Sequence, residues 1–331
     1  MRQTFSIVVP VFQNEESLDE TFSRLLSLRS QLANYDLELV LVDDGCPGRS
    51  FEILSAYAKR YPDTIKLVKL TRNFGQTAAT QAGLQHATGA CVGIISADLQ
   101  EPCELFVDMV HEWEEGAKFV IGERRSRAEG WWHRKTSGIY WRVAGRAFPD
   151  FPAMGYDFCL LDRQVVEGVN QINEKNSSIF LLIYWLGYEP VRIPVDRGLR
   201  TAGHSQWNLW KKVSFTVDTL IGFTYVPARL ITILGFAAAA LCMLHLIVML
   251  AMWFFFGTAP PGWMTLVGLL ALFGSIILFS LGIISEYLLR ILDETRKRPP
   301  YVVERVVNRV LDQDDNNTSP ASQSRSGGKT A

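Results

Sequence analysis

The sequence predicts an α/β fold with a mostly parallel sheet, followed by two helices that are long enough to cross a bilayer. From residue 1 to about residue 200, short apolar runs alternate with longer stretches of helical periodicity. That order is typical of a parallel sheet covered by helices. After Pro227 the composition changes sharply, and two long runs are almost entirely apolar. The two patterns separate a sheet domain from a membrane region.

Five strands and four helices are expected in the first part of the chain. The strands are predicted at short apolar runs, which lie at residues 7–9, 38–42, 65–70, 91–95 and 118–121. The connecting helices are predicted near residues 16–33, 49–60, 76–87 and 103–115. Residues 126–147 combine tryptophan and tyrosine with arginine and lysine, and we expect this segment to be helical or mobile.

The two apolar runs cover residues 230–256 and 263–289. As a helix, each run would be roughly 40 Å long, which exceeds the bilayer core of about 30 Å and leaves room for tilt. The alternative is a pair of buried core helices, but helices of globular proteins rarely stay apolar over such a length. The runs therefore predict a hairpin of two spans, joined by an uncharged turn at residues 257–262.

Basic residues flank both outer ends of this hairpin. They are Lys211, Lys212 and Arg229 before the first run, and Arg290, Arg296, Lys297 and Arg298 after the second. Because basic residues stay on the cytoplasmic side, both termini and the sheet domain should be cytoplasmic. We therefore expect a multi-pass protein of the cytoplasmic membrane.

The composition divides the chain into five parts. The sheet domain covers residues 1–204 and the hairpin covers residues 227–290. Residues 205–226 mix aromatic, basic and apolar positions, which suits a helix in the membrane interface, although a connecting helix packed on the sheet domain also fits. We expect a cytoplasmic segment at residues 291–310 and a disordered tail at residues 311–331, because the tail has almost nothing to bury.

The net charge and the cysteine spacing limit the kinds of ligand and partner that the protein is expected to bind. The formal net charge of −1 gives no argument for a nucleic-acid partner. The five cysteines are dispersed, without metal-ligand spacing, so we expect reduced thiols and no zinc site. Small residues in the apolar runs permit close helix packing, which leaves a homo-oligomer open.

The most informative motif lies at residues 92–102. An apolar run there predicts a buried strand, and Asp98 and Gln100 follow it, before Pro102. A parallel strand delivers such residues to a ligand crevice, and Mg²⁺ or Mn²⁺ prefers carboxylate and carbonyl oxygens together with phosphates. The motif therefore predicts a site for a metal-bound diphosphate. Ser96 stands where a second carboxylate would be expected.

Three further polar segments follow predicted strands. They are residues 10–16, the acidic pair Asp43 and Asp44 before Gly45, and residues 72–76, which contain Gly75. Taken alone, the acidic pair and the glycine more often belong to simple turns. Because the carboxyl ends of parallel strands share one edge of a sheet, the segments together predict a single site.

The order of these motifs resembles family 2 glycosyltransferases of the GT-A fold. The matching segments are Asp43-Asp44-Gly45, Arg72-Asn73-Phe74-Gly75 and Ala97-Asp98-Leu99-Gln100-Glu101-Pro102. With the apolar hairpin, the chain is similar to the polyisoprenyl-phosphate glycosyltransferases. This group includes GtrB-type glucosyltransferases, ArnC-type aminoarabinose transferases and dolichyl-phosphate mannose synthases. The resemblance extends from about residue 5 to about residue 303 and implies a Rossmann-like catalytic domain.

The resemblance implies roles for individual residues on the donor side. Asp98 and Gln100 would hold Mg²⁺ or Mn²⁺, with Asp98 also catalytic, and Asp157 would lie near the reacting sugar as the second catalytic residue. The residues that would line the donor nucleotide are Pro10, Phe12, Glu15, Asp43, Asp44, Asn73, Gly75 and Ala97.

On the acceptor side, the resemblance points to a basic set. The residues that would contact phosphates or the acceptor are Arg124, Arg125, Arg127, Arg134, Ser137, Arg200 and Ser205. Donor and acceptor are both anionic, so cationic groups are needed to offset their repulsion. Without the resemblance, the same arginines could form a patch that binds anionic lipid headgroups.

The implied function is inverting transfer of a sugar from a UDP- or GDP-sugar to undecaprenyl or dolichyl phosphate at the cytoplasmic face, for a cell-envelope glycan or lipid. Two alternatives remain: a catalytically silent homologue that serves as a membrane scaffold, and a transferase with another lipid acceptor. The chain departs from the family pattern at Ser96, Cys46, Gly48, Cys159 and Gln206. These departures concern donor identity and metal affinity more than the class of reaction.

Overall fold

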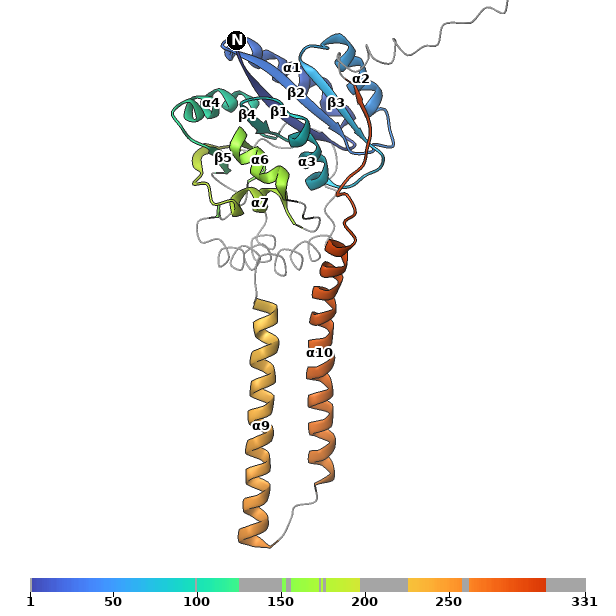
Figure 1. Cartoon of the computed structure of the whole chain (residues 1–331), viewed down its shortest axis with the longest axis vertical. Coiled ribbons are helices and arrows are strands. Elements are labelled where there is room, and N and C mark those ends of the chain that lie inside the picture. The colour runs from blue at the N-terminus through green and yellow to red at the C-terminus, as the bar shows by residue number, and fades with distance from the viewer. Residues whose placement is uncertain are drawn as a thin grey trace, which may run out of the picture. The chain divides into compact units, whose positions relative to one another are not determined.

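The structure is a computed structural model with two compact units, one built on a sheet and the other containing two long helices (Figure 1). It describes residues 2–98, 100–124, 151–152, 156–172, 174, 177–196, 226–257 and 262–307. The expectations for residues 126–147, for the tail at 311–331 and for almost all of residues 205–226 lie outside these ranges.

One sheet of eight strands organises the first unit, in the order β7-β5-β6-β4-β1-β2-β3-β8. The strands are β1 (Gln3–Val11), β2 (Tyr35–Asp43), β3 (Ile65–Leu70), β4 (Cys91–Ile94), β5 (Phe119–Arg124), β6 (Cys159–Asp162), β7 (Val191–Val195) and β8 (Val303–Val307). Strands β6 and β8 run antiparallel to their neighbours and the other pairings are parallel. The five predicted strands are confirmed, and β6, β7 and β8 are additional.

The four predicted helices are also confirmed. The helices of this unit are α1 (Leu18–Gln31), α2 (Ser50–Arg60), α3 (Gln76–His86), α4 (Phe106–Glu114), α6 (Arg163–Gln171) and α7 (Ile179–Trp185). Short 3₁₀ turns, η1 (Glu15–Ser17) and η2 (Cys103–Leu105), precede α1 and α4. Helices α6 and α7 were not predicted from the sequence pattern.

Helices cover both faces of the sheet because β1 is apolar on both sides. Phe5 belongs to the core that α1, α2 and α4 cover, and its ring lies 5.5 Å from the ring of Phe106. Val8 points to the other face, where α3 packs so closely that a Cβ at Gly83 would lie 2.2 Å from Val8 Cγ1. A strand buried on both faces is typical of parallel sheets in α/β proteins.

The strand order locates a crevice at the centre of the sheet. The chain proceeds from β1 to β2 and β3 on one side, then returns to place β4 on the other side of β1. In open α/β sheets, ligands bind outside the carboxyl ends of the strands at such a switch point. The segments after Val11 and after Ile94 therefore flank the expected ligand site.

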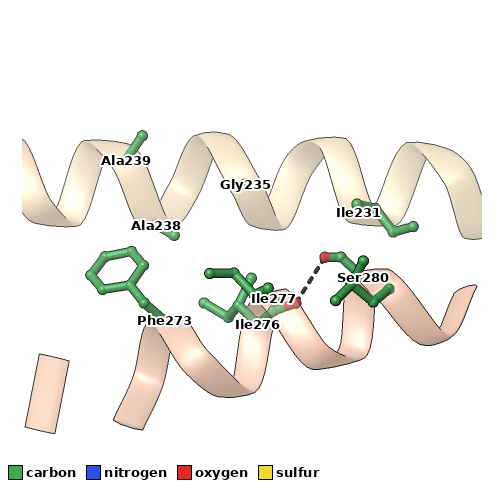
Figure 2. Close-up of a pocket in the computed structure, with 9 residues that line it drawn as sticks. Ile231, Gly235, Ala238, Ala239, Phe273, Ile276, Ile277 and Ser280 are labelled. Carbon is green, nitrogen blue, oxygen red and sulfur yellow. Dashed lines mark hydrogen bonds between the residues drawn. The ribbon is translucent and has the colours of Figure 1, made fainter. Parts of the chain in front are cut away.

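The second unit contains α9 (Val226–Phe256) and α10 (Trp263–Thr295). Both helices are long and apolar enough to cross a membrane, and their side chains are largely exposed. The two predicted apolar runs are thus confirmed as continuous helices, and α10 continues past the predicted end at residue 289. Figure 2 shows that Gly235 and Ala238 of α9 face Phe273 and Ile277 of α10 around a small apolar pocket.

Candidate active site

Asp98 is held at the end of β4 by contacts with β1 and α1. The Ile95 amide donates to the Val8 carbonyl at 3.1 Å. The Ala97 carbonyl accepts from Ser17 Oγ at 2.7 Å and from Thr21 Oγ1 at 3.3 Å. These bonds fix the chain just before Asp98, whose residue surface is only 4% exposed.

Asp98 and Gln100 offer the chemistry that a hard cation requires. The Gln100 amide lies 3.4 Å from Asp98 Oδ1, so the two residues share one tight turn. Within the described residues, no group of three His, Cys, Asp or Glu side chains could hold a metal ion by itself. One carboxylate and one amide oxygen fit Mg²⁺ or Mn²⁺ when the phosphates of a ligand supply the remaining positions. The set therefore fits a metal that binds together with its substrate.

Asp44 fixes the segment of residues 72–75, which we name the donor loop. Its Oδ1 accepts from the Phe74 amide at 2.7 Å and its Oδ2 accepts from the Gly75 amide at 2.9 Å. Asp44 is only 3% exposed. Both carboxylate oxygens thus hold the backbone at the start of α3, and the predicted contact of Asp44 with the nucleotide stays a prediction.

Gly45 allows the donor loop to lie against the end of β2. Its φ of +62° falls in the left-handed region, and a Cβ there would lie 2.3 Å from the Arg72 carbonyl carbon and 2.6 Å from the Asn73 nitrogen. Only glycine accommodates both this conformation and this close approach of backbone. The Asp-Asp-Gly sequence is therefore a structural clamp on the donor loop.

The other member of the acidic pair, Asp43, is fully buried. Its Oδ1 accepts from the Cys46 amide at 3.3 Å, and within the described part of the chain its Oδ2 has no hydrogen-bond partner. Burial raises the pKa of Asp43 and raises the pKa of the Cys46 thiol to about 12. Cys46 is therefore a neutral thiol at physiological pH, which excludes a thiolate at this position.

The segment after β1 is shaped by Glu15. Its Oε1 accepts from the Arg49 amide at 2.6 Å, and a Cβ at Gly48 would lie 2.0 Å from the same oxygen. The Glu15 carboxylate thus lies directly beside Gly48. Nearby, Asn14 Oδ1 accepts from the Phe12 amide at 3.2 Å, which folds the segment into a turn.

Asp157 reaches the same edge of the sheet through β6. Because β6 is antiparallel to β4, Cys159 pairs with Ile94, and the chain just before β6 lies at the carboxyl end of β4. Tyr156 and Phe158 are buried on either side of the half-buried Asp157. The Tyr156 hydroxyl donates to the Phe180 carbonyl at 2.5 Å. Buried aromatic neighbours therefore fix the backbone that carries Asp157.

The structure brings together most of the predicted donor residues at the carboxyl edge. Pro10 pairs with Val42 inside the sheet, and Arg124 ends β5, where its backbone pairs with Val195 of β7. The remaining predicted acceptor residues lie outside the described residues: Arg125, Arg127, Arg134, Ser137, Arg200 and Ser205. Cys159 is buried within β6, and burial raises the pKa of its thiol.

Sequence reasoning missed Ser17 and Thr21. They lie four residues apart, so they share one face at the start of α1, and both hydroxyls reach Ala97. A pair of hydroxyls at helical spacing opposite a metal motif could have signalled this contact. Both are positioning residues for Asp98.

We expect the double variant Ser17→Ala with Thr21→Val to lower turnover about tenfold, because a freed loop displaces the Asp98 carboxylate, which is predicted to hold the metal. Steady-state assays and thermal unfolding of the variant would measure this. Ser30→Ala, on an exposed hydroxyl near the end of α1, is the matched control and should leave turnover unchanged. Equal turnover in the double variant and the wild type would contradict the positioning role.

The donor loop should respond to pH through Asp44. Burial raises the pKa of Asp44 to about 6, although the Phe74 and Gly75 amides favour the ionised form. Since the folded pKa exceeds the ordinary value of 3.8, the contribution of Asp44 to the free energy of unfolding falls as pH rises through 6. Its ability to hold both amides changes in the opposite direction, because protonation removes one acceptor.

We therefore expect the Kd for a nucleotide-sugar to rise about tenfold from pH 7 to pH 5, with a midpoint near 6. A nucleotide-sugar has no phosphate monoester, so the ligand itself does not titrate in this range. Calorimetry across this range tests the prediction. Asp44→Asn should bind weakly at every pH, and a wild-type-like profile in that variant would assign the titration to another group.

The fold is an α/β sheet whose polar segments lie at a switch-point crevice, the place where such sheets bind ligands. The family described as Glycosyl transferase family 2 matches residues 6–167. The chain is 34% identical over 304 residues to Uncharacterized glycosyltransferase YkcC of Bacillus subtilis (strain 168), covering 91% of this chain and 93% of that protein.

Two further relatives carry more specific names. One is the Prophage bactoprenol glucosyl transferase homolog of Escherichia coli (strain K12), with 31% identity over 91% of this chain and 98% of the relative. The other is the Undecaprenyl-phosphate 4-deoxy-4-formamido-L-arabinose transferase of Edwardsiella ictaluri (strain 93-146), with 30% identity over 92% and 94%. The chain belongs to glycosyl transferase family 2, and its two apolar helices indicate a membrane-associated glycosyltransferase.

Proposed function

We propose that this glycosyltransferase moves a sugar from a nucleotide-sugar to a polyisoprenyl phosphate at the cytoplasmic face of a membrane. The observation that carries the proposal is the joint placement of Asp98, Asp157 and the donor loop at one edge of the sheet. The names of the bactoprenol and undecaprenyl-phosphate relatives support the lipid acceptor.

In the proposed reaction, an oxygen of the acceptor phosphate attacks the anomeric carbon while the bond from this carbon to the donor diphosphate breaks. A phosphate monoester has a second pKa near about 6, so the attacking oxygen is already ionised at neutral pH. The enzyme therefore needs no strong general base. Direct displacement inverts the configuration at the anomeric carbon.

The proposal assigns a separate role in the reaction to each group of site residues. Asp98 and Gln100 would hold Mg²⁺ or Mn²⁺, which offsets the negative charge of the leaving diphosphate. Asp157 orients the sugar and stabilises positive charge near the anomeric carbon, with proton acceptance as a second role. Arg124 and the basic residues that follow it would neutralise the two phosphate groups.

The two apolar helices would anchor the enzyme beside its lipid substrate. Exposed aromatic side chains gather where α9 ends and α10 begins, at Trp253, Phe254, Phe255 and Trp263. Tryptophan prefers the interface between lipid and water, so Trp253 and Trp263 fit a position at a membrane surface. The basic residues that flank the other ends of both helices support an orientation with the termini in the cytoplasm.

The test is transfer by purified full-length protein with Mg²⁺, undecaprenyl phosphate and a panel of UDP- and GDP-sugars. A sugar-linked lipid phosphate should form with one donor and should be absent with Asp98→Ala. Metal-dependent donor binding without turnover would favour the silent homologue, and transfer only to a different lipid would favour another acceptor.

A further inference from the structure

We propose that residues 299–307, which we name the C-terminal strap, position the donor loop for nucleotide binding, and that Tyr301 is a positioning residue. The inference rests on the proposed function, because it concerns the same donor site. It adds a role for a segment that the sequence assigned only to the region after the membrane helices.

The strap extends the sheet up to the first residue before the donor loop. Strand β8 pairs with β3 in antiparallel register, from Leu67 opposite Val307 to Leu70 opposite Val303. One residue further on, the Thr71 amide donates to the Val302 carbonyl at 3.0 Å. The last backbone bond of the strap therefore holds the chain where the donor loop begins.

An ion pair supports the same pairing from the side chains. Lys69 Nζ lies 2.9 Å from Glu304 Oε1, and both side chains are partly exposed. The ammonium of Lys69 also lies 4.7 Å from the centre of the Phe51 ring on α2. The strap is thus joined to β3 both through backbone and through side chains.

Tyr301 connects the strap to the helix that follows the donor loop. Its residue surface is 9% exposed, and its hydroxyl donates to Gln85 Oε1 near the end of α3. Burial raises the pKa of the Tyr301 hydroxyl to about 12, so it remains a donor at physiological pH. The strap therefore contacts both elements that the donor loop joins, β3 and α3.

The donor loop is consequently held from two directions. Asp44 and Gly45 hold it from the end of β2, and the strap holds the strand before it and the helix after it. Without the strap, β3 would be an edge strand, and edge segments with few partners open locally more easily. A loop that is competent only part of the time binds with an apparent Kd raised by the inverse of that fraction.

The experiment measures donor affinity and turnover of the full-length protein in detergent, with UDP and GDP in the presence of Mn²⁺ and with the matching nucleotide-sugar. Tyr301→Ala should raise the Kd for the bound nucleotide about tenfold and raise the donor KM by a similar factor, with kcat changed less than twofold. Tyr301→Phe keeps the ring and should restore most of the affinity.

Tyr35→Ala is the matched control. Tyr35 is the first residue of the interior strand β2, at the amino ends of the parallel strands, and its hydroxyl bonds to Glu114. This variant loses a ring of the same size, so it should lose thermal stability while its nucleotide Kd stays within twofold of wild type. An equal rise in Kd in both variants would make Tyr301 a general stability residue and overturn the inference.

A second pair of variants applies if Tyr301→Ala does not fold. Tyr301→Phe and Gln85→Leu each remove only the side-chain hydrogen bond, and each should raise the Kd two- to threefold, with no further rise in the double variant. An unchanged nucleotide Kd in both single variants and in the double variant would overturn the proposed role of the strap. Wild-type protein that binds neither nucleotide would instead refute the proposed function, and the inference with it.

Discussion

Replacing Asp98 by alanine should lower transfer turnover by about 10³-fold or more, because it removes the buried carboxylate that the proposed function assigns to the metal and the donor diphosphate. The side chain is buried, so the loss concerns a fixed group rather than a mobile surface charge. Single-turnover transfer by the purified enzyme measures the effect, and the Mn²⁺ dependence of donor binding should disappear in the same variant.

Two further variants test the role of Asp98. Asp108→Ala removes an exposed carboxylate from α4 and should leave turnover within twofold of wild type. Ser96→Asp places a second carboxylate two residues before Asp98 and should tighten metal binding. Retained transfer in Asp98→Ala would move the metal and its chemistry elsewhere, and unchanged metal affinity in Ser96→Asp would show that position 96 does not face the ion.

Gly45→Ala should abolish measurable donor binding, with a rise in Kd of about 100-fold or more, because the added Cβ would lie 2.3 Å from the backbone of Arg72. The contact is with backbone, which cannot move aside as a flexible side chain can. The donor loop must therefore shift, and the Asp44 bonds to Phe74 and Gly75 shift with it. Calorimetry with a nucleotide and Mn²⁺ measures the loss.

Gly116→Ala is a control that separates the effect of backbone strain from the effect of a steric clash. Gly116 also has a positive φ, of +109°, but nothing lies within 4 Å of its added Cβ. That variant should lose about 1–2 kcal/mol of unfolding free energy from backbone strain and keep its donor affinity. Normal donor binding by Gly45→Ala would show that the donor loop does not depend on its packing against Gly45.

The sequence predicts those parts of the fold that depend on a pattern of neighbouring residues. The strand at Ile65–Leu70 and the two long helices follow from runs of mainly apolar residues. Strand β8 could not be predicted in this way. Its three valines are only half-buried and its two charged residues are exposed. Its partner strand lies more than 200 residues earlier in the chain, as the pair Lys69 and Glu304 shows.

The sequence predicted that the candidate site lies at a set of strand ends. It did not predict which atoms each site residue contacts. Asp44 and Gly45 were expected beside the nucleotide, and the structure gives them backbone partners in the donor loop. Such partners depend on the distance between two strand ends, which no local pattern encodes. The contacts of the Ser17 and Thr21 hydroxyls with the Ala97 carbonyl could not be predicted for the same reason.

The position of β8 has a practical consequence for truncation. A shortened protein that ends before α9 lacks the spans and also lacks an edge strand of the catalytic sheet. Loss of donor affinity in such a protein would therefore reflect the missing strap as well as the missing anchor. Variants of the full chain avoid this ambiguity.

In the proposed function, residues at one edge of the sheet transfer a sugar to a lipid phosphate. The most direct measurement is mass spectrometry of undecaprenyl phosphate after incubation with full-length enzyme, Mg²⁺ and each nucleotide-sugar in turn. We predict one lipid product heavier by a single sugar residue, formed by wild type and by Asp108→Ala but not by Asp98→Ala. A lipid that stays unmodified with every donor, or a product that forms equally with Asp98→Ala, would contradict the proposed function.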